Sequence, residues 1–212
     1  MRDKTLHQLL RIDIGDEPAA WGNAGFSVVD GETRIGSTVI RLRGSQNGRG
    51  ILSAGIDGVV DSIDGLTISP PIPRFNAKIT PIHSNLVAGL DHVVATSPDM
   101  DRTVEALTHA GLELRRTRLH TSNEGSNRQA FFWLGDVILE VAGPDESHDP
   151  DPARWWGLAF ISPDLSASRD ALDGLLGDPR EAVQPGRLIA GLHTDDLDIS
   201  VPIVFMSPHS AQ

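Results

Sequence analysis

The sequence contains no cysteine and no tyrosine in its 212 residues. The absence of cysteine excludes disulfides, thiolate metal ligands and cysteine nucleophiles, and the absence of tyrosine excludes a phenolic acid, base or nucleophile. Long hydrophobic runs are also missing, both from the amino-terminal stretch MRDKTLHQLLRID and from the rest of the chain. Because signal peptides and transmembrane helices need such runs, we expect a cytoplasmic protein with no membrane partner.

Positive charge is scarce, with 18 lysine and arginine residues against 29 aspartate and glutamate residues, for a net charge of -11. A surface this acidic repels phosphate backbones, so we expect no nucleic-acid partner. Motifs of several common enzyme classes are absent too: the sequence has no Gly-x-Ser-x-Gly elbow, no Walker loop and no His-Glu-x-x-His. The most informative remaining feature of the sequence is the order of the predicted elements.

The middle of the chain predicts a strand, a helix and three further strands. LDHVVAT (90–96) is rich in β-branched residues and predicts a strand, and Asp99 in the following SPD can cap a helix. Apolar residues at steps of three and four predict that helix over MDRTVEALTHAG (100–111). LELRRTRLHT (112–121) alternates as a strand does, and RQAFFWLGDVILEVAG (128–143) predicts two strands around a tight Gly-Asp turn.

The same order recurs later in the chain. SPDMDRTVEAL begins at Ser97 and SPDLSASRDAL begins at Ser162, an offset of 162 − 97 = 65 residues. WWGLAFI precedes the second copy, and three further strand-like stretches follow it. We therefore predict one module over residues 86–143, a polar, proline-rich linker over 144–153 and a second module over 154–212.

A fainter third copy is predicted at the amino terminus, over residues 1–44. LLRIDI predicts a strand, DEPAAWGNAGF predicts a short helix, and TRIGSTVIRLRG aligns with FFWLGDVILEVAG at an offset of 135 − 36 = 99. Residues 45–85 are rich in glycine, serine, asparagine and proline, so we predict a linker that holds one possible strand, GILSAGI. The amino-terminal unit can pack on the open edge of the other two modules or pair across a homodimer.

The order of these pieces resembles the glyoxalase and bleomycin-resistance superfamily, also called vicinal oxygen chelate proteins. The resemblance rests on LDHVVATSPDMDRTVEAL, GDVILEV, GLAFISPDL and AVQPGR, and it covers residues 86–209. It implies an α+β fold in which tandem βαβββ modules form a cupped mixed sheet around a small-molecule cavity. It also implies that metal-using members hold a divalent ion with ligands from the first and fourth strands of each module.

His92 on the first strand and Glu140 on the fourth fall at the ligand positions that the resemblance implies. Imidazole and carboxylate both bind divalent ions, and Glu140 is also a candidate catalytic base. Strand alternation places Glu140 on the face opposite Leu139 and Val141, which predicts a polar cup at that point. The alternative is that the two residues only satisfy each other through a hydrogen bond.

The second module departs from this pattern. The offset of 65 places Gly157 and Phe205 where the second ligand pair would lie, and neither side chain binds metal. Two protein ligands are generally too few for a tight site. His193 is therefore the first candidate for a further ligand, before His83 and His120.

Aromatic side chains are the candidates for the wall of the cavity. Trp133, Trp156 and Phe205 are predicted to line it, although aromatic residues of this kind more often pack in a core or cover an edge.

Two functions follow from the resemblance. The first is a metal-dependent lyase, isomerase or ring-cleaving dioxygenase that acts on a small oxygen-rich substrate and uses one zinc, nickel, manganese or iron ion. The second is a metal-free protein that binds or sequesters a small molecule without catalysis. The presence of His92 and Glu140 favours the first, whereas Gly157 and Phe205 favour the second.

Overall fold

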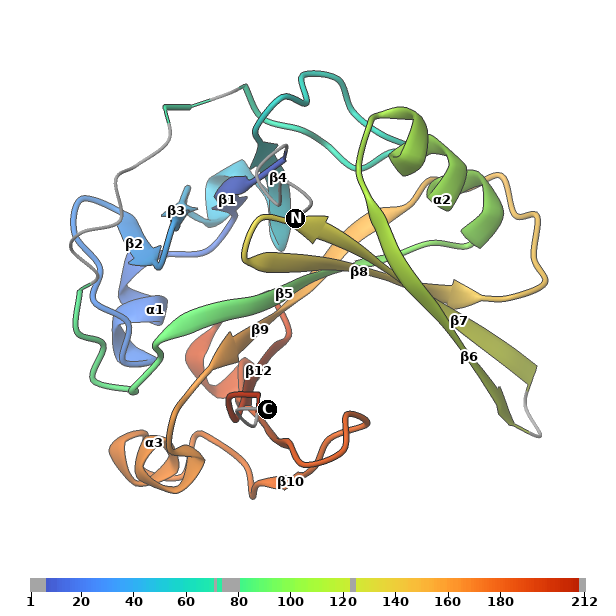
Figure 1. The fold of residues 1–212 in the computed structure, drawn as a ribbon. Coiled ribbons are helices and arrows are strands. Elements are labelled where there is room, and N and C mark those ends of the chain that lie inside the picture. The colour runs from blue at the N-terminus through green and yellow to red at the C-terminus, as the bar shows by residue number, and fades with distance from the viewer. Residues whose placement is uncertain (1–6, 71, 74–80, 123–124, 210–212) are drawn as a thin grey trace.

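The computed structural model describes residues 7–70, 72–73, 81–122 and 125–209 (Figure 1). These residues form a four-stranded sheet and an eight-stranded sheet, together with short helices. The eight-stranded sheet is mixed, because it contains both parallel and antiparallel pairs. This architecture confirms the α+β class and the cupped mixed sheet predicted from the sequence. No helix in these ranges is long and apolar enough to cross a membrane.

The four-stranded sheet is built by the amino-terminal part of the chain. Its elements are β1 (Leu9–Ile14), α1 (Pro18–Asn23), β2 (Glu32–Ile35), β3 (Thr38–Leu42), the 3-10 turn η1 (Ser45–Asn47) and β4 (Ile51–Ile56). The strands lie in the order β2-β3-β1-β4, with β1 parallel to β3 and antiparallel to β4. The strand expected within the linker at 45–85 is thus an edge strand of this sheet.

The eight-stranded sheet contains both predicted βαβββ modules. The first comprises β5 (Gly89–Thr96), α2 (Met100–His109), β6 (Leu114–Ser122), β7 (Gly125–Leu134) and β8 (Val137–Pro144). The second comprises β9 (Arg154–Ile161), α3 (Leu165–Ala171), β10 (Arg180–Glu181), β11 (Leu188–Gly191), the 3-10 turn η2 (Asp195–Leu197) and β12 (Ile203–Met206). The strand order is β10-β11-β12-β9-β5-β8-β7-β6, so the modules join where β5 pairs antiparallel with β9.

The repeated SPD sequence forms the same helix cap in both modules. The Asp99 side chain accepts a hydrogen bond of 3.0 Å from the backbone N–H of Arg102 at the start of α2. Asp164 accepts one of 3.0 Å from the backbone N–H of Ala167 at the start of α3. An aspartate at this position satisfies a backbone donor that the first helical turn leaves unpaired. The sequence repeat is therefore a structural repeat.

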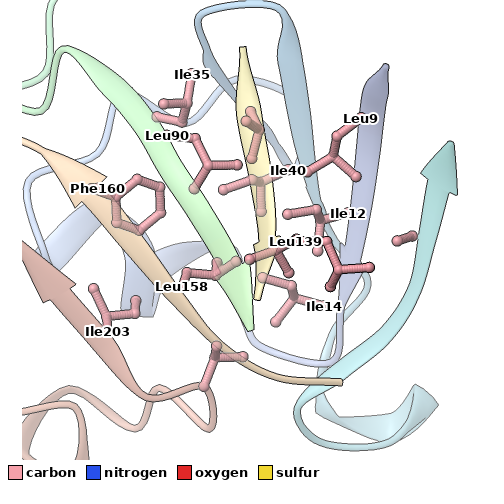
Figure 2. Close-up of a cluster of buried hydrophobic side chains, with 14 of the residues drawn as sticks. Leu9, Ile12, Ile14, Ile35, Ile40, Leu90, Leu139, Leu158, Phe160 and Ile203 are labelled. Carbon is pink, nitrogen blue, oxygen red and sulfur yellow. The ribbon is translucent and has the colours of Figure 1, made fainter. Parts of the chain in front are cut away.

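The main hydrophobic core lies between the two sheets. Figure 2 shows side chains of β1 and β3 meeting those of β5, β8 and β9. Ile12, Leu139 and Phe160 are each 0% exposed, and burying such a side chain contributes about 1.5–3 kcal/mol. The smaller sheet thus packs on one face of the larger sheet within the same chain, and not on its open edge as the first of the two alternatives predicted. This packing leaves the opposite face of the larger sheet to form the cup.

Candidate functional site

Polar and aromatic side chains gather on the cup face of β5, β7 and β8. Leu139 and Val141 are fully buried in the core, so Glu140 between them points to the other face. The same alternation buries Phe132 and places Phe131 and Trp133 in the cup. The predicted orientation of Glu140 therefore agrees with the structure.

Two adjoining cavities occupy the cup. The first, which we call the arginine cavity, has a volume of about 710 Å³, and its walls include Arg115, Arg116, Arg118, Trp133, Asp136 and Arg187. The second, which we call the apolar cavity, has a volume of about 520 Å³, and its walls include Val94, Ala142, Trp156, Val183, Val204 and Met206. His92 and Glu140 line both cavities and mark their junction.

His92 lies between two carboxylates at this junction. Its Nδ1 atom is 2.8 Å from Oδ2 of Asp91, and its Nε2 atom is 3.6 Å from Oε2 of Glu140. Burial opposes ionisation of Asp91, but hydrogen bonds from His92 and Arg187, together with their charges, outweigh it and lower its pKa to about 2. Because an ionised carboxylate only accepts, Nδ1 carries the proton and Nε2 is directed toward Glu140.

Arg187 of the second module holds Asp91 in place. Its Nη2 atom donates to Oδ1 of Asp91 at 2.8 Å, and its side chain is only 2% exposed. Its Nε atom donates to the backbone oxygen of Ser207 at 2.8 Å, and its Nη1 atom donates to Oε1 of Gln184 at 2.8 Å. A buried arginine that is bound at three of its nitrogens is a rigid support for the carboxylate that orients His92.

Glu140 is held by a neighbouring strand. The Gln129 side chain on β7 donates from Nε2 to Oε1 of Glu140 at 2.6 Å. The other oxygen, Oε2, remains directed toward His92. The carboxylate is thus fixed by one oxygen and available at the other.

Three irregularities in strand pairing add side chains to the cup. The register between β5 and β9 shifts at Asp91 and again at Trp156, and the register between β6 and β7 shifts at Arg115. A bulge of this kind inserts one residue and re-aims its side chain. All three residues line the cup, and the first bulge allows Asp91 and His92 to face the same cavity.

Phe205 was predicted to line the cavity and to be equivalent to Glu140, and both predictions are wrong. The equivalent position lies one residue earlier in β12. The backbone N–H of Ser97 binds the Ala142 oxygen, and that of Ser162 binds the Met206 oxygen, each at 2.9 Å. Ala142 and Met206 are therefore equivalent, and Glu140 corresponds to the residue before Phe205, which is Val204 (142 − 140 = 2 and 206 − 2 = 204).

A shift of one residue turns a strand side chain to the other face of the sheet. Phe205 is accordingly 0% exposed and packs in the core, with its ring centroid 6.2 Å from that of Phe160 and 6.5 Å from that of Phe26. Val204 and Met206 line the apolar cavity instead. The second module still lacks a ligand at this position, because valine cannot bind metal.

The other predicted site residues are divided between the cup and the surface. Trp133 lines the arginine cavity, and Trp156, which is 51% exposed, lines the apolar cavity. His193 lines neither; it lies beyond β11, three strands from β5, with Nδ1 3.9 Å from Asp196. His120 is exposed on β6.

His83 has a structural role in the amino-terminal unit. Its Nδ1 atom accepts from the backbone N–H of Ser27 at 3.0 Å, and its Nε2 atom lies 3.1 Å from the Arg34 oxygen. Burial lowers the pKa of His83, partly offset by the bond to Arg34. With both ring nitrogens engaged, His83 cannot serve as the further ligand.

The donors present do not complete a site for a tightly held divalent ion. Within the described ranges, no three histidine, aspartate or glutamate side chains converge as metal ligands do. His92 and Glu140 supply two donors, whereas the equivalent positions in the second module are Gly157 and Val204. Tight sites for zinc or iron usually have three or four protein ligands, so this pair does not fit a resident ion.

Asp91, Arg187 and the arginines of β6 line the cup but were not among the residues predicted for the site. Asp91 adjoins His92, but strand alternation assigns neighbours to opposite faces, and only the bulge brings both into the cup. In LELRRTRLHT, Arg116 and Arg118 occupy alternate positions and Arg115 adjoins them, so the sequence does contain a signal for a cationic strand face.

Comparison with solved structures places this geometry in a known fold. A 4-hydroxymandelate synthase mutant from Streptomyces coelicolor aligns with a TM-score of 0.61 at 12% identity, covering 97% of this chain and 93% of that one. A catechol 2,3-dioxygenase aligns with a TM-score of 0.54 at 12% identity, covering 97% of this chain and 96% of that one. No protein-family model and no curated protein matches the chain.

The resemblance predicted from the sequence is thereby confirmed at the level of the fold. The chain has the fold of the glyoxalase, or vicinal oxygen chelate, superfamily. Because the alignments cover 97% of the chain, the likeness extends beyond the two predicted modules to the amino-terminal sheet.

Proposed function

We propose that the cup binds a small oxygen-rich molecule and that His92 transfers a proton to or from it. The observation that carries this proposal is the row of Asp91, His92 and Glu140 at the junction of the two cavities. The reaction class that suits such a row is an isomerisation or elimination that begins with removal of a proton next to a carbonyl group.

His92 has the arrangement of a general base. The ionised Asp91 accepts the Nδ1 proton and fixes the ring, so Nε2 presents a lone pair to the cup. When Nε2 takes a proton, the resulting imidazolium lies between Asp91 and Glu140, and both carboxylates stabilise its charge. Asp91 and Arg187 are positioning residues in this scheme, because they act through His92.

Glu140 supplies a second group at the same place. Its Oε2 atom lies 3.6 Å from Nε2 of His92, so a single reacting atom of the substrate can contact both. We assign Glu140 to the stabilisation of protonated His92, which returns the proton to the substrate from Nε2 either directly or by way of Oε2 of Glu140. Trp133 and Trp156 would form walls of the cavity on either side of this junction.

Two alternatives share the same cup. A protein that binds a small molecule without catalysis is favoured by the apolar side chains of the second module, such as Val204 and Met206. A lyase or dioxygenase with a zinc, nickel, manganese or iron ion at His92 and Glu140 is disfavoured by the incomplete donor set.

We also propose a cytoplasmic location and a homodimer. Sedimentation at several protein concentrations tests the homodimer.

Proton exchange in deuterium oxide tests the proposed catalysis. A panel of small 2-oxo acids, hydroxy ketones and their esters is incubated with the protein, and loss of the proton next to the carbonyl is followed by NMR. We expect exchange that falls by at least about 100-fold in His92→Gln and Glu140→Gln, as is typical for loss of an acid–base group. His193→Gln, outside the cup, is the matched control and should keep the wild-type rate. Absence of exchange with the whole panel, or equal rates in all variants, contradicts the proposal.

A further inference from the structure

Three arginines stand together on one strand of an otherwise acidic protein. Arg115, Arg116 and Arg118 of β6 all line the arginine cavity. In the part of the chain that the structure describes, none of them forms an ion pair with a carboxylate. With a net charge of -11, the chain has acidic side chains in excess, yet these three cations are left without one. Although Asp91, Asp136 and Glu140 line the same cavity, no carboxylate of the described residues occupies the N–H donors of these three arginines in an ion pair.

Aromatic rings hold these guanidinium groups in place. Arg115 lies with its Cζ atom 4.4 Å from the ring centroid of Trp133. Arg116 and Arg118 lie 4.8 Å and 5.9 Å from the ring centroid of Phe131. A guanidinium stacked on a ring keeps its N–H donors free at the edge, which is the geometry that binds carboxylate, sulfonate or phosphate oxygens.

The grouping of the arginines is costly without an anion. Burial and then repulsion from Arg118 and Arg115 lower the pKa of Arg116, despite the attraction of Glu140. The bulge at Arg115 adds the third cation to the same face of the strand. A bound anion would remove this repulsion, whereas a neutral ligand would leave it in place.

The apolar cavity, on the other side of His92 and Glu140, has mainly hydrophobic walls. The apolar cavity is lined by the side chains of Val94, Ala142, Val204 and Met206, with the exposed ring of Trp156 at its wall. It adjoins the arginine cavity at His92 and Glu140. Both volumes lie within the usual range of small-molecule sites, so the two cavities can hold the two ends of one ligand.

We propose that the substrate is an amphipathic organic anion, with its acidic group at Arg115, Arg116 and Arg118 and its apolar body among Val204, Met206 and Trp156. The atoms between these two ends then lie at His92 and Glu140. This inference rests on the proposed function, since it assigns the substrate class of the same cup. The proposal excludes neutral sugars, inorganic ions and uncharged apolar compounds as substrates.

Fluorescence of anilinonaphthalene sulfonate, an aromatic sulfonate, measures this binding directly. The dye should bind once per chain, because the acidic remainder of the surface repels it. We expect affinity to fall about tenfold in Arg116→Gln and in Arg118→Gln, since each removes a charge-assisted hydrogen bond. Arg180→Gln, which removes an exposed arginine outside both cavities, is the matched control and should bind as the wild type does.

Displacement of the dye from the wild-type protein tests the same inference without any variant. Hexanoate should displace it at a concentration at least about tenfold lower than hexanamide, which lacks the charge, or acetate, which lacks the apolar body. Equal displacement by hexanoate and hexanamide, or equal dye affinity in Arg116→Gln and Arg180→Gln, overturns the inference. If these binding results are as expected but no proton exchange occurs, the substrate class stands and only the proposed catalysis fails.

Discussion

Asp91 and Arg187 are 96 positions apart in the chain and form an ion pair of 2.8 Å that joins the two modules across the cup. Asp91 is also bound to His92, so one carboxylate connects the second module to the candidate base of the first. Neither residue is a member of the ligand pair expected from the sequence. The candidate site is therefore a single unit made by both modules, although only the first carries His92 and Glu140.

Removal of Arg187 should destabilise the protein. Arg187→Met leaves the buried Asp91 with only the hydrogen bond from His92, so we expect the free energy of unfolding to fall by about 3 kcal/mol. Urea denaturation measures this change. Arg180→Met, at an exposed arginine outside the cup, should change it by less than about 0.5 kcal/mol. A result for Arg187→Met as small as that of the control contradicts the buried pair.

The pH dependence of the free energy of unfolding should reveal the ionisation of Asp91. Its pKa is about 2 in the folded protein and 3.8 ordinarily, so the unfolded chain binds the proton more readily. The stabilisation is therefore complete above about pH 4 and is lost as the pH falls toward about 2, with a total of about 2 kcal/mol. The difference in unfolding free energy between wild type and Asp91→Asn should shrink over this interval. A difference that stays constant down to pH of about 2 shows that the Asp91 pKa is not lowered.

The incomplete donor set predicts no stoichiometric metal. Protein purified without a chelating column should contain far less than one zinc, nickel, manganese or iron ion per chain by elemental analysis. Addition of these ions should leave the melting temperature unchanged, and Glu140→Ala should behave as the wild type does. One ion per chain that disappears in Glu140→Ala would show that His92 and Glu140 recruit ligands beyond those that converge in the structure.

The corrected register of β12 predicts opposite effects at neighbouring positions. Phe205→Ala should lower the free energy of unfolding by about 3–5 kcal/mol, because it opens a cavity in the core. Val204→Ala should cost about 1 kcal/mol or less, yet it should weaken binding of the sulfonate dye, because Val204 lines the apolar cavity. The reverse ranking in stability, measured by urea denaturation, contradicts the assigned register.

The order of the modules and the direction of the Glu140 side chain could be predicted from local patterns in the sequence. The offset of 65 between the SPD copies, the helix caps at Asp99 and Asp164, and the alternation that turns Glu140 away from Leu139 are all local patterns. Such patterns are readable because capping and strand alternation depend on residues close together in the chain. The cupped α+β fold and the pair His92 and Glu140 were implied by the family resemblance that the order of these patterns carries.

Which residues share the cup depends on pairing between strands that are distant in the chain. The bulges at Asp91, Arg115 and Trp156 arise from pairing between strands, and the offset of 64 that makes Val204 equivalent to Glu140 appears only in the backbone hydrogen bonds (204 − 140 = 64). A shift of one residue reverses the face of a strand, so these details cannot be obtained from periodicity. The partnership of Asp91 with Arg187 likewise depends on how β5 and β9 join the modules.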